Sequence, residues 1–445
     1  MAPTAESLTS ALAGRSSSLE FAGLPADVVE LASLCLLDWL GVTLAGSGEA
    51  PARIVFDALD GGGTGAGVSV VGRPERLRPL DAALVNGTAS HALDFDDVNM
   101  VMVGHPSVAV LGAALALGEE LGSRGADLLA AFVAGYETMC RVAAAIGPGP
   151  YGRGAHSTGT VGTFGAAAAC ASLLRLDAAR TAQALGLAAT QAAGLKSMFG
   201  TMAKPLHAGK ACYNGLLAAQ LAAGGFTAHP AAVEADQGFA AVAGGECDLE
   251  AALADPPSGW HVRGNLWKHH ASCYMTHSTI EGIRDLRLSS QVAAAEVEEV
   301  VVHASPMELG ACAIPEPATV LQVKFSLAHL AAMSLLGRPT DVIAEADVRD
   351  GEVTALRRRV KVVPDGRPGA PTVVEVYSRG GRRCTAAHDV NRPETDVAAL
   401  RRRLLAKFET LAAPVLGDDR AGELSQAALR FGPADEVAAL MALTH

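Results

Sequence analysis

Hydrophobic side chains recur at intervals of three and four residues through the first 264 positions, which is the spacing of a buried or amphipathic helix. The first such run, ADVVELASLCLLDWLGVTLAG, follows Pro25 and ends in glycine. Further runs occupy residues 81–94, 108–122, 125–147, 161–176, 177–193 and 211–226. Several are apolar nearly all round, as are helices inside a bundle or covered by a second subunit. The pattern predicts a large helical domain and favours a homodimer.

The pattern changes near residue 265. Runs of β-branched residues at 297–304 and 360–364 predict strands, and residues 371–390 read as two strands joined by a Gly-Gly turn. Between them, residues 319–337 have the spacing of a single helix. This mixture predicts an α+β unit, with an antiparallel sheet and helices on one side of it.

Helical spacing returns after Pro393, and we expect this last segment to pack back on the first domain. The predicted fold is therefore mainly α with a smaller α+β domain. We assign residues 1–264 and 394–445 to the helical domain and residues 265–393 to the α+β domain.

Composition refines this picture. Half of the residues are hydrophobic but only 4% are aromatic, so the interior must consist largely of Ala, Leu and Val, which favours closely approaching helices. The formal net charge is -12, and the basic residues form no long run. Nucleic acid is therefore not expected as a partner, because such binding depends on neutralising phosphates.

We expect a cytoplasmic protein that does not enter a membrane. The opening MAPTAESLTSALAGRS lacks the basic start and apolar run of a signal peptide, and later apolar windows are interrupted by charges before about 18 residues. The eight cysteines include no C-x-x-C pair, which fits reduced thiols rather than a compact metal motif.

Four polar clusters stand out against the apolar helices, each at a predicted helix edge or loop. They are His91, Asp94, Asp96, Asp97 and His105 in HALDFDDVNMVMVGHPS; Tyr151 and His156 in YGRGAHSTGT; Lys204, His207 and Lys210 in FGTMAKPLHAGKA; and Lys268, His269, His270, Cys273 and His277 in WKHHASCYMTH. Each member also has a structural interpretation, since a lone histidine is commonly a packed residue and aspartates cap backbone amides.

Common cofactor sites are not indicated. A magnesium–diphosphate site would need a second carboxylate cluster, and the glycine-rich residues 60–72 match neither a phosphate-binding loop nor a dinucleotide fingerprint. We therefore expect no metal and no cofactor. The remaining lysines, histidines, aspartate and tyrosine suit proton removal from carbon beside a carboxylate, because their cations can stabilise the charge that develops there. A small carboxylate is the expected substrate.

The motifs HALDFDD followed by GHPS, AHSTGTVGTFGAAAA, FGTMAKPLHAGKACYNGLLAAQLAAGGFTA, KHHASCYMTHSTIEGI and VKFSLAHLAA together resemble the MmgE/PrpD family. This family includes 2-methylcitrate dehydratase, cis-aconitate decarboxylase and iminodisuccinate epimerase. The resemblance implies a helical domain completed by C-terminal helices, an α+β lid, a homodimer, and an active site between the domains without metal or organic cofactor.

The resemblance also places site positions on residues that match its motifs. In that setting His105 and His156 would transfer protons, Lys204 and Lys268 would hold carboxylates, and Asp94 would orient a histidine or bind substrate. Four further residues are candidates for lining the substrate site: His207, Cys273, Val98 and Met102. The activity implied first is that of a lyase of dehydratase type, which removes an α-proton and expels a β-hydroxyl.

Two departures from the family's motifs bear on the substrate. Val98 and Asn99 replace a polar pair and are followed by an apolar run to Val103, which suits either a less polar substrate or packing beneath the site. Cis-aconitate decarboxylases carry a histidine where this chain has Cys273, which argues against their activity.

Two alternatives to a dehydratase stay open. Tyr151 and the SCY-x-x-H motif are similar to the iminodisuccinate epimerase branch, where a tyrosine and a lysine on opposite faces of the carbon could exchange one proton. An epimerase or isomerase using the same site is therefore the alternative activity. A non-catalytic binding protein on the same fold is a third interpretation, because fold alone does not determine function.

Overall fold

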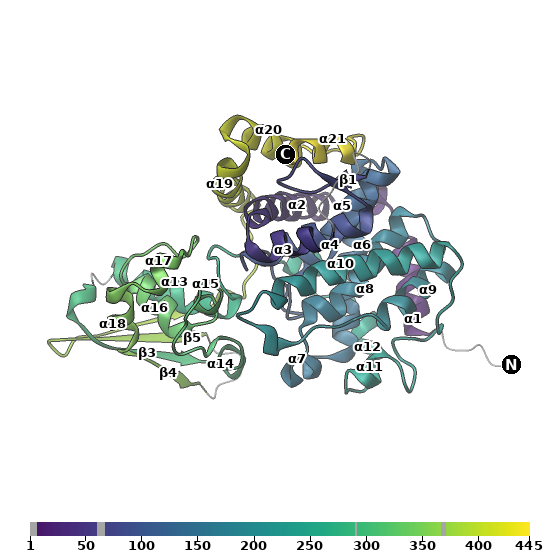
Figure 1. Cartoon of the computed structure of the whole chain (residues 1–445). Helices are drawn as coiled ribbons and strands as arrows, with labels where there is room; N and C mark the ends of the chain where they lie inside the picture. The colour runs from purple at the N-terminus through teal and green to yellow at the C-terminus, as the bar shows by residue number, and fades with distance from the viewer. Residues whose placement is uncertain (1–6, 60–66, 290–291, 366–370) are drawn as a thin grey trace. The chain divides into compact units, whose positions relative to one another are not determined.

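The computed structural model describes residues 7–59, 67–289, 292–365 and 371–445. It divides into two compact units (Figure 1). Unit 1 comprises Met1–Ser197, Ala203–Trp267 and Pro393–His445, and unit 2 comprises Met198–Met202 and Lys268–Arg392. Of the glycine-rich segment 60–72, residues 60–66 lie outside the described residues.

Unit 1 is a helical bundle, as the hydrophobic spacing predicts. Its helices are α1 (Leu8–Ser17), α2 (Ala26–Ser47), α3 (Ala50–Ala58), α4 (Pro79–Ala92), α5 (Pro106–Leu121), α6 (Gly125–Ile146), α7 (Gly149–Arg153), α8 (Ser157–Leu173), α9 (Ala178–Ala189), α10 (Ala203–Ala223), α11 (Phe239–Val242), α12 (Leu249–Leu253), α19 (Val397–Leu416), α20 (Asp418–Leu429) and α21 (Val437–Met441). Helix α10 packs against α4, α5 and α8, and α19 packs against α2. A short antiparallel pair, β1 (Val68–Ser69) with β2 (Arg76–Leu77), accompanies the helices.

Small residues let the central helices approach closely. A Cβ atom on Gly209 of α10 would lie 2.2 Å from Thr88 Oγ1 of α4. A Cβ atom on Gly215 would lie 2.3 Å from the Cβ of Ala166 on α8. Both distances are well inside van der Waals contact, so α10 can take these positions only with glycine there. The close packing expected from the low aromatic content is confirmed.

Unit 2 contains a four-stranded sheet in the order β4-β3-β5-β6. The strands are β3 (Val297–Ala304), β4 (Val360–Pro364), β5 (Thr372–Ser378) and β6 (Arg383–His388). Helices α13 (His277–Ser289) and α16 (Leu327–Leu335) lie on one face of the sheet (Figure 1), and their apolar residues share a core with Val300, Val302 and Val374. The strands and the covering helices match the prediction.

The prediction of an antiparallel sheet is wrong for one pair. β3 and β4 run parallel, with Val300 opposite Val360, while the other two pairs are antiparallel. Parallel neighbours need a long crossover, and the connection between them supplies it. It carries α14 (Pro306–Cys312), α15 (Val320–Val323), α16, α17 (Glu345–Val348) and α18 (Gly351–Arg357).

The single helix predicted over residues 319–337 is also wrong, because it is interrupted between α15 and α16. Ser326 caps α16, and its hydroxyl accepts a hydrogen bond from the backbone N–H of His329. The carbonyl of Lys324 is turned to accept from the backbone N–H of Cys273 at 3.0 Å. Apolar spacing continues across the break, so periodicity does not reveal it.

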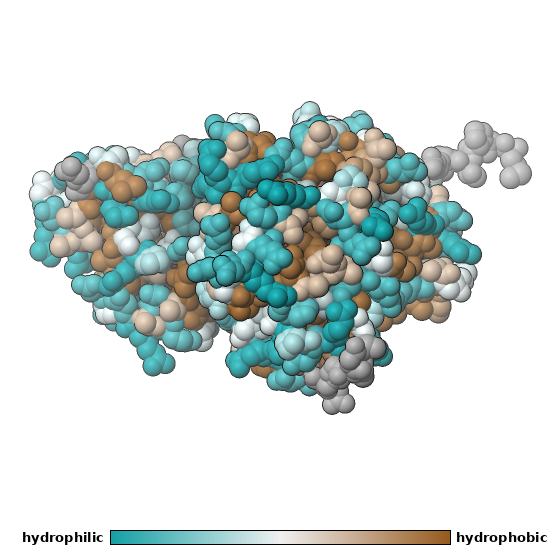
Figure 2. Space-filling view, turned by 90° about the horizontal axis from the view of Figure 1, so that it is seen from above, coloured by the Kyte–Doolittle hydropathy of each residue, from teal (hydrophilic) through white to brown (hydrophobic). Residues whose placement is uncertain are grey.

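Two helices, α2 and α6, are long and apolar enough to cross a membrane by length and composition alone, although charged residues interrupt both. Of their most apolar windows, 72% and 94% are buried inside the structure. On the face in Figure 2, small hydrophobic areas are interspersed with hydrophilic residues, an ordinary distribution for a folded surface.

Candidate functional site

Four histidines from separate segments of unit 1 come together. His91 lies near the end of α4, His105 directly before α5, His156 directly before α8, and His207 in the first turns of α10. The ring centroids of His91 and His105 are 4.6 Å apart, those of His91 and His156 are 5.9 Å apart, and those of His156 and His207 are 5.2 Å apart. We call these four residues the histidine cluster. Two of its members, His105 and His156, are predicted proton-transfer residues.

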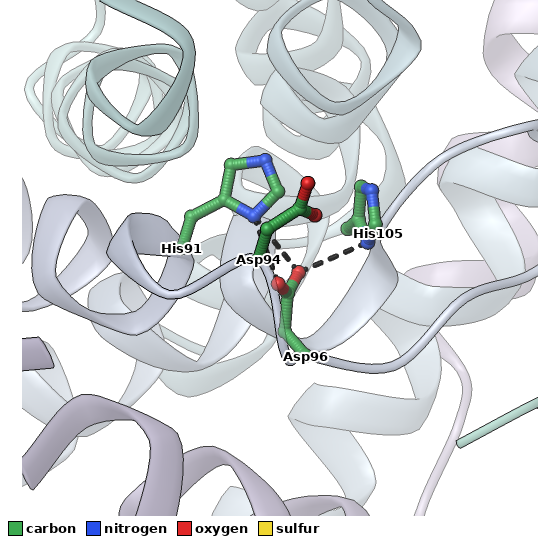
Figure 3. A group of neighbouring side chains, drawn as sticks. All are labelled: His91, Asp94, Asp96 and His105. Carbon is green, nitrogen blue, oxygen red and sulfur yellow. Dashed lines mark hydrogen bonds and ion pairs between the residues drawn. The ribbon is translucent and has the colours of Figure 1, made fainter. Parts of the chain in front are cut away.

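Asp96 joins two members of the cluster (Figure 3). Its carboxylate oxygens lie 2.9 and 3.0 Å from His91 Nδ1, and one of them lies 3.0 Å from His105 Nδ1. A carboxylate can only accept, so His91 donates through Nδ1 and its lone pair is on Nε2. In the described part of the chain, this Nε2 atom is buried without a hydrogen-bond partner. A bound group that donates a hydrogen bond can satisfy it.

A buried ion pair lies beside the histidines. Lys204 Nζ is 2.7 Å from Asp94 Oδ1, and the two side chains are only 5% and 4% exposed. Asp94 has φ of +54°, a left-handed conformation that aspartate tolerates better than most residues. The backbone at Asp94 is therefore strained, and the ion pair with Lys204 helps to hold it in this conformation.

Burial keeps three of the four imidazoles neutral, those of His91, His156 and His207. Desolvation lowers the pKa of His91 to about 3, despite the opposing effect of Asp96. Desolvation also holds the pKa of His156 well below its ordinary value, and the charges of neighbouring cations add to this. The pKa of His207 is lowered by burial and by the charge of Lys204. His156 Nδ1 and His207 Nδ1 are 2.9 Å apart, so one of them donates and the other accepts.

The site is built from the first residues of helices. His105 and His156 occupy the N-cap positions of α5 and α8, and Lys204 is the second residue of α10. Helix N-termini carry partial positive charge and unpaired N–H groups, which favour bound anions. Together with the ammonium of Lys204, this arrangement suits a carboxylate ligand.

Asp97 lies next to this site, and its carboxylate accepts hydrogen bonds from the backbone and the side chain of Ser107. Ser107 donates to it through N at 3.1 Å and through Oγ at 2.5 Å. Burial raises the pKa of Asp97 to about 7, and the nearby charges of Asp38 and Asp96 contribute in the same direction. Asp97 thus binds a proton in the folded chain at a pH where it would be ionised in the unfolded chain.

This shift predicts a pH-dependent effect of Asp97→Asn on stability. Between its ordinary value near 3.8 and a folded pKa of about 7, the folded protein binds more protons than the unfolded one, so this group's contribution to stability falls as pH rises. Asparagine does not titrate. The stability of the variant relative to wild type should therefore increase by roughly 2–3 kcal/mol between pH 5 and pH 8. Urea unfolding at both pH values measures this, and a constant difference would contradict it.

Two residues of the apolar run in the same loop, Val98 and Met102, are buried, whereas Val101 is 45% exposed. Val98 pairs with Leu266 through backbone hydrogen bonds, and Met102 belongs to the main core of unit 1. Val103 has φ of +47°, a conformation that strains a β-branched residue by about 1–3 kcal/mol. A Cβ atom on Gly104 would lie 3.0 Å from the methyl of Met102, so a side chain there would push against the core. These contacts favour the packing interpretation of the run.

Four of the site residues could hold a divalent cation. His91, Asp94, Asp96 and His105 offer ligand atoms within 4.8 Å of one another. However, both Nδ1 atoms are engaged with Asp96, and the Lys204 ammonium beside Asp94 would repel a metal ion. The contacts fit a network that shares protons better than a metal centre, and the absence of a metal stays a prediction.

The other predicted residues lie elsewhere in the chain. Tyr151 is on α7, where the ammonium of Lys196 lies 3.9 Å from the centre of its ring. Lys268 and Cys273 belong to unit 2, and Lys268 is fully buried. Its charge is one of those that lower the pKa of the buried His277, after the larger effects of desolvation and of His270.

Two residues of the site were not assigned a role from the sequence, although both stand in the first polar cluster. His91 and Asp96 are five positions apart, one at the end of a helix and the other in the following loop. The signal was the density of polar residues in HALDFDD. Their contact depends on how that loop turns back, which spacing alone does not specify.

Residues 10–252 match the model of the MmgE/PrpD N-terminal domain, and residues 270–430 match that of the MmgE/PrpD C-terminal domain. A cis-aconitate decarboxylase of Aspergillus terreus (strain NIH 2624 / FGSC A1156) is 26% identical over 470 residues, covering 96% of this chain and 94% of that protein. The cis-aconitate decarboxylase of Homo sapiens is 33% identical over 242 residues, covering 53% of this chain and 50% of that protein. The second matched region extends beyond unit 2 into α19 and α20.

Proposed function

The chain belongs to the MmgE/PrpD family, and from this premise we propose that it is a lyase acting on a small carboxylate, of dehydratase type. The observation that carries the proposal is the histidine cluster, with His91 and His156 buried, beside the Asp94–Lys204 ion pair. It combines neutral proton acceptors with a cation and with helix N-termini. The reaction would need no metal or organic cofactor.

Neutral imidazoles suit the first step of a dehydration. A histidine whose pKa is lowered by burial is already deprotonated at neutral pH, so it can accept the α-proton without first losing one. The electron pair of the broken C–H bond forms the carbon–carbon double bond. The β-hydroxyl takes up a proton and leaves as water. His105 and His156 are the residues that we assign to these proton transfers.

Positive charge suits the substrate's carboxylates. Removal of an α-proton increases the negative charge beside a carboxylate, and a buried cation stabilises that charge more strongly than one in water. We assign this role to Lys204, and the same role for Lys268 of unit 2 stays a prediction from the sequence. Asp94 pairs with Lys204 and holds its ammonium, whereas Asp96 orients His91 and His105.

A decarboxylase is the second candidate, and the names of the relatives favour it. In that reaction the bond between carbon and a carboxylate breaks, carbon dioxide leaves, and the electron pair that stays on carbon takes up a proton. Both reactions develop negative charge beside a carboxylate, so the same lysines would serve. Cys273, at the position where the family resemblance implies a histidine in cis-aconitate decarboxylases, is the feature that argues against decarboxylation.

Nuclear magnetic resonance in deuterated water tests the proposal. The full chain is incubated with citrate-like hydroxy acids, with cis-aconitate and with amino-dicarboxylates. We expect loss of water from a hydroxy acid with appearance of a vinyl proton signal, because a hydro-lyase forms a carbon–carbon double bond. His105→Ala serves as the paired variant and should abolish that signal.

Each other outcome has a defined meaning. Release of carbon dioxide from cis-aconitate would select the decarboxylase. Deuterium incorporation with inversion and without elimination would select the epimerase that the sequence left open. No exchange with any compound, from a folded chain, would overturn the lyase proposal, and near-normal turnover by His105→Ala would overturn the role of that residue.

A further inference from the structure

A second buried lysine contacts the loop that carries the site aspartates. Lys407 lies on α19, in the C-terminal segment of unit 1, and is 9% exposed. Its Nζ donates to the backbone carbonyl of Phe95 at 2.7 Å and is 2.7 Å from Asp38 Oδ1 on α2. It also lies 4.1 Å from the centre of the Phe95 ring. One ammonium thus joins two helices to this loop.

The carbonyl that Lys407 binds stands between the two carboxylates of the site. Phe95 follows Asp94, which is in the left-handed conformation, and precedes Asp96, which contacts His91 and His105. Rotation of the Phe95 peptide would move both neighbouring side chains. A displacement of about 1 Å in such a group can cost about a hundredfold in rate.

We propose that Lys407 is a positioning residue, which together with Asp38 holds the Phe95 peptide so that Asp94 and Asp96 meet their partners. This inference rests on the proposed lyase function. Burying a lysine–aspartate pair is unfavourable unless its geometry is good, and an apolar pair of equal volume often stabilises a protein more. The lysine supplies what an apolar residue cannot, which is a donor to the Phe95 carbonyl.

The test compares three variants. Lys407→Met/Asp38→Asn removes both charges, so that no unpaired carboxylate is left in the interior. We expect its kcat to fall by about 10- to 100-fold with KM changed less than about threefold, because the substrate's cationic partners are retained. Lys407→Arg keeps the charge and the donors and should recover most of the loss. Arg76→Met/Glu119→Gln removes another partly buried ion pair of unit 1, at β2 and the end of α5, and should leave kcat unchanged.

A measurement without substrate separates this inference from the proposed function. The imidazole signals of 13C-labelled histidines report the environments of His91 and His105, and we expect them to shift in Lys407→Met/Asp38→Asn but not in the Arg76 and Glu119 control. If wild type is inactive on every compound, the shift still supports positioning by Lys407. Unchanged histidine signals and kcat in the folded double variant would overturn the inference, as would an equal loss of kcat in the control.

Discussion

Asp96→Asn is expected to lower kcat by roughly 1,000- to 10,000-fold without unfolding the chain. Asp96 is 1% exposed and lies within 3.0 Å of Nδ1 of both His91 and His105. The same carboxylate oxygen, Oδ2, lies 2.9 Å from His91 Nδ1 and 3.0 Å from His105 Nδ1, and Oδ1 lies 3.0 Å from His91 Nδ1. An asparagine replaces one of these oxygens with an NH2 group and removes the charge. An imidazole that faces the NH2 group must accept at Nδ1 and carry its proton on Nε2, which reverses its role in proton transfer.

Asp97→Asn is the matched control, since it makes the same chemical change one residue away. Its amide can accept from Ser107 N and donate to Ser107 Oγ, so the described contacts are retained. We expect kcat within about threefold of wild type at pH 7, because Asp97 does not contact an imidazole through its side chain. Steady-state kinetics of the two variants, with circular dichroism to confirm folding, decide the point. Equal kcat for the two would refute the orienting role of Asp96.

Local pattern was sufficient to predict the main elements of the fold. Residues 297–304 and 360–364 are strands with the predicted bounds, and helix α6 ends within one residue of its predicted segment. These segments are long or strongly β-branched, so local preference and tertiary packing agree. The MmgE/PrpD family was identified from short motifs in the same way, and both family models confirm it.

Features that depend on distant segments were not predicted. The parallel pairing of β3 with β4 depends on the route of a long crossover, and the break before α16 depends on a carbonyl that turns toward Cys273. Neither the pairing nor the break changes the hydrophobic spacing, because the apolar residues on each side keep their period.

The same distinction between local pattern and distant contacts applies to the site. The residue types and their loops were visible in HALDFDD and in the lysine and histidine motifs, since buried charges are rare without a partner. The partners themselves were not visible. Asp94 meets Lys204 across 110 positions of sequence, and Phe95 meets Lys407 across 312. Only the packing of α10 and α19 on the bundle brings these pairs together.

Lys204→Met is expected to lower both the stability of the chain and its activity, each for a different reason. The substitution leaves Asp94 buried without the ammonium that lies 2.7 Å from it, which should destabilise the chain by about 3–5 kcal/mol. It also removes a cation from the carboxylate site, so kcat/KM should fall by roughly 100- to 1,000-fold, through kcat as well as KM, because Lys204 is proposed to stabilise the charge that develops during proton removal. Urea unfolding and steady-state kinetics measure the two effects.

The double variant Lys204→Met/Asp94→Asn separates the effect on stability from the effect on activity. With both charges gone, most of the lost stability should return, since the penalty arises from burying the Asp94 carboxylate without the Lys204 ammonium rather than from the missing contact. Activity should not return, because the substrate still lacks its cation. Lys210→Met, on the same helix but packed against Tyr213, controls for loss of a lysine from α10 and should keep kcat/KM within about threefold. If activity recovered together with stability, Lys204 would be a structural residue, and carboxylate binding would have to be assigned to another group.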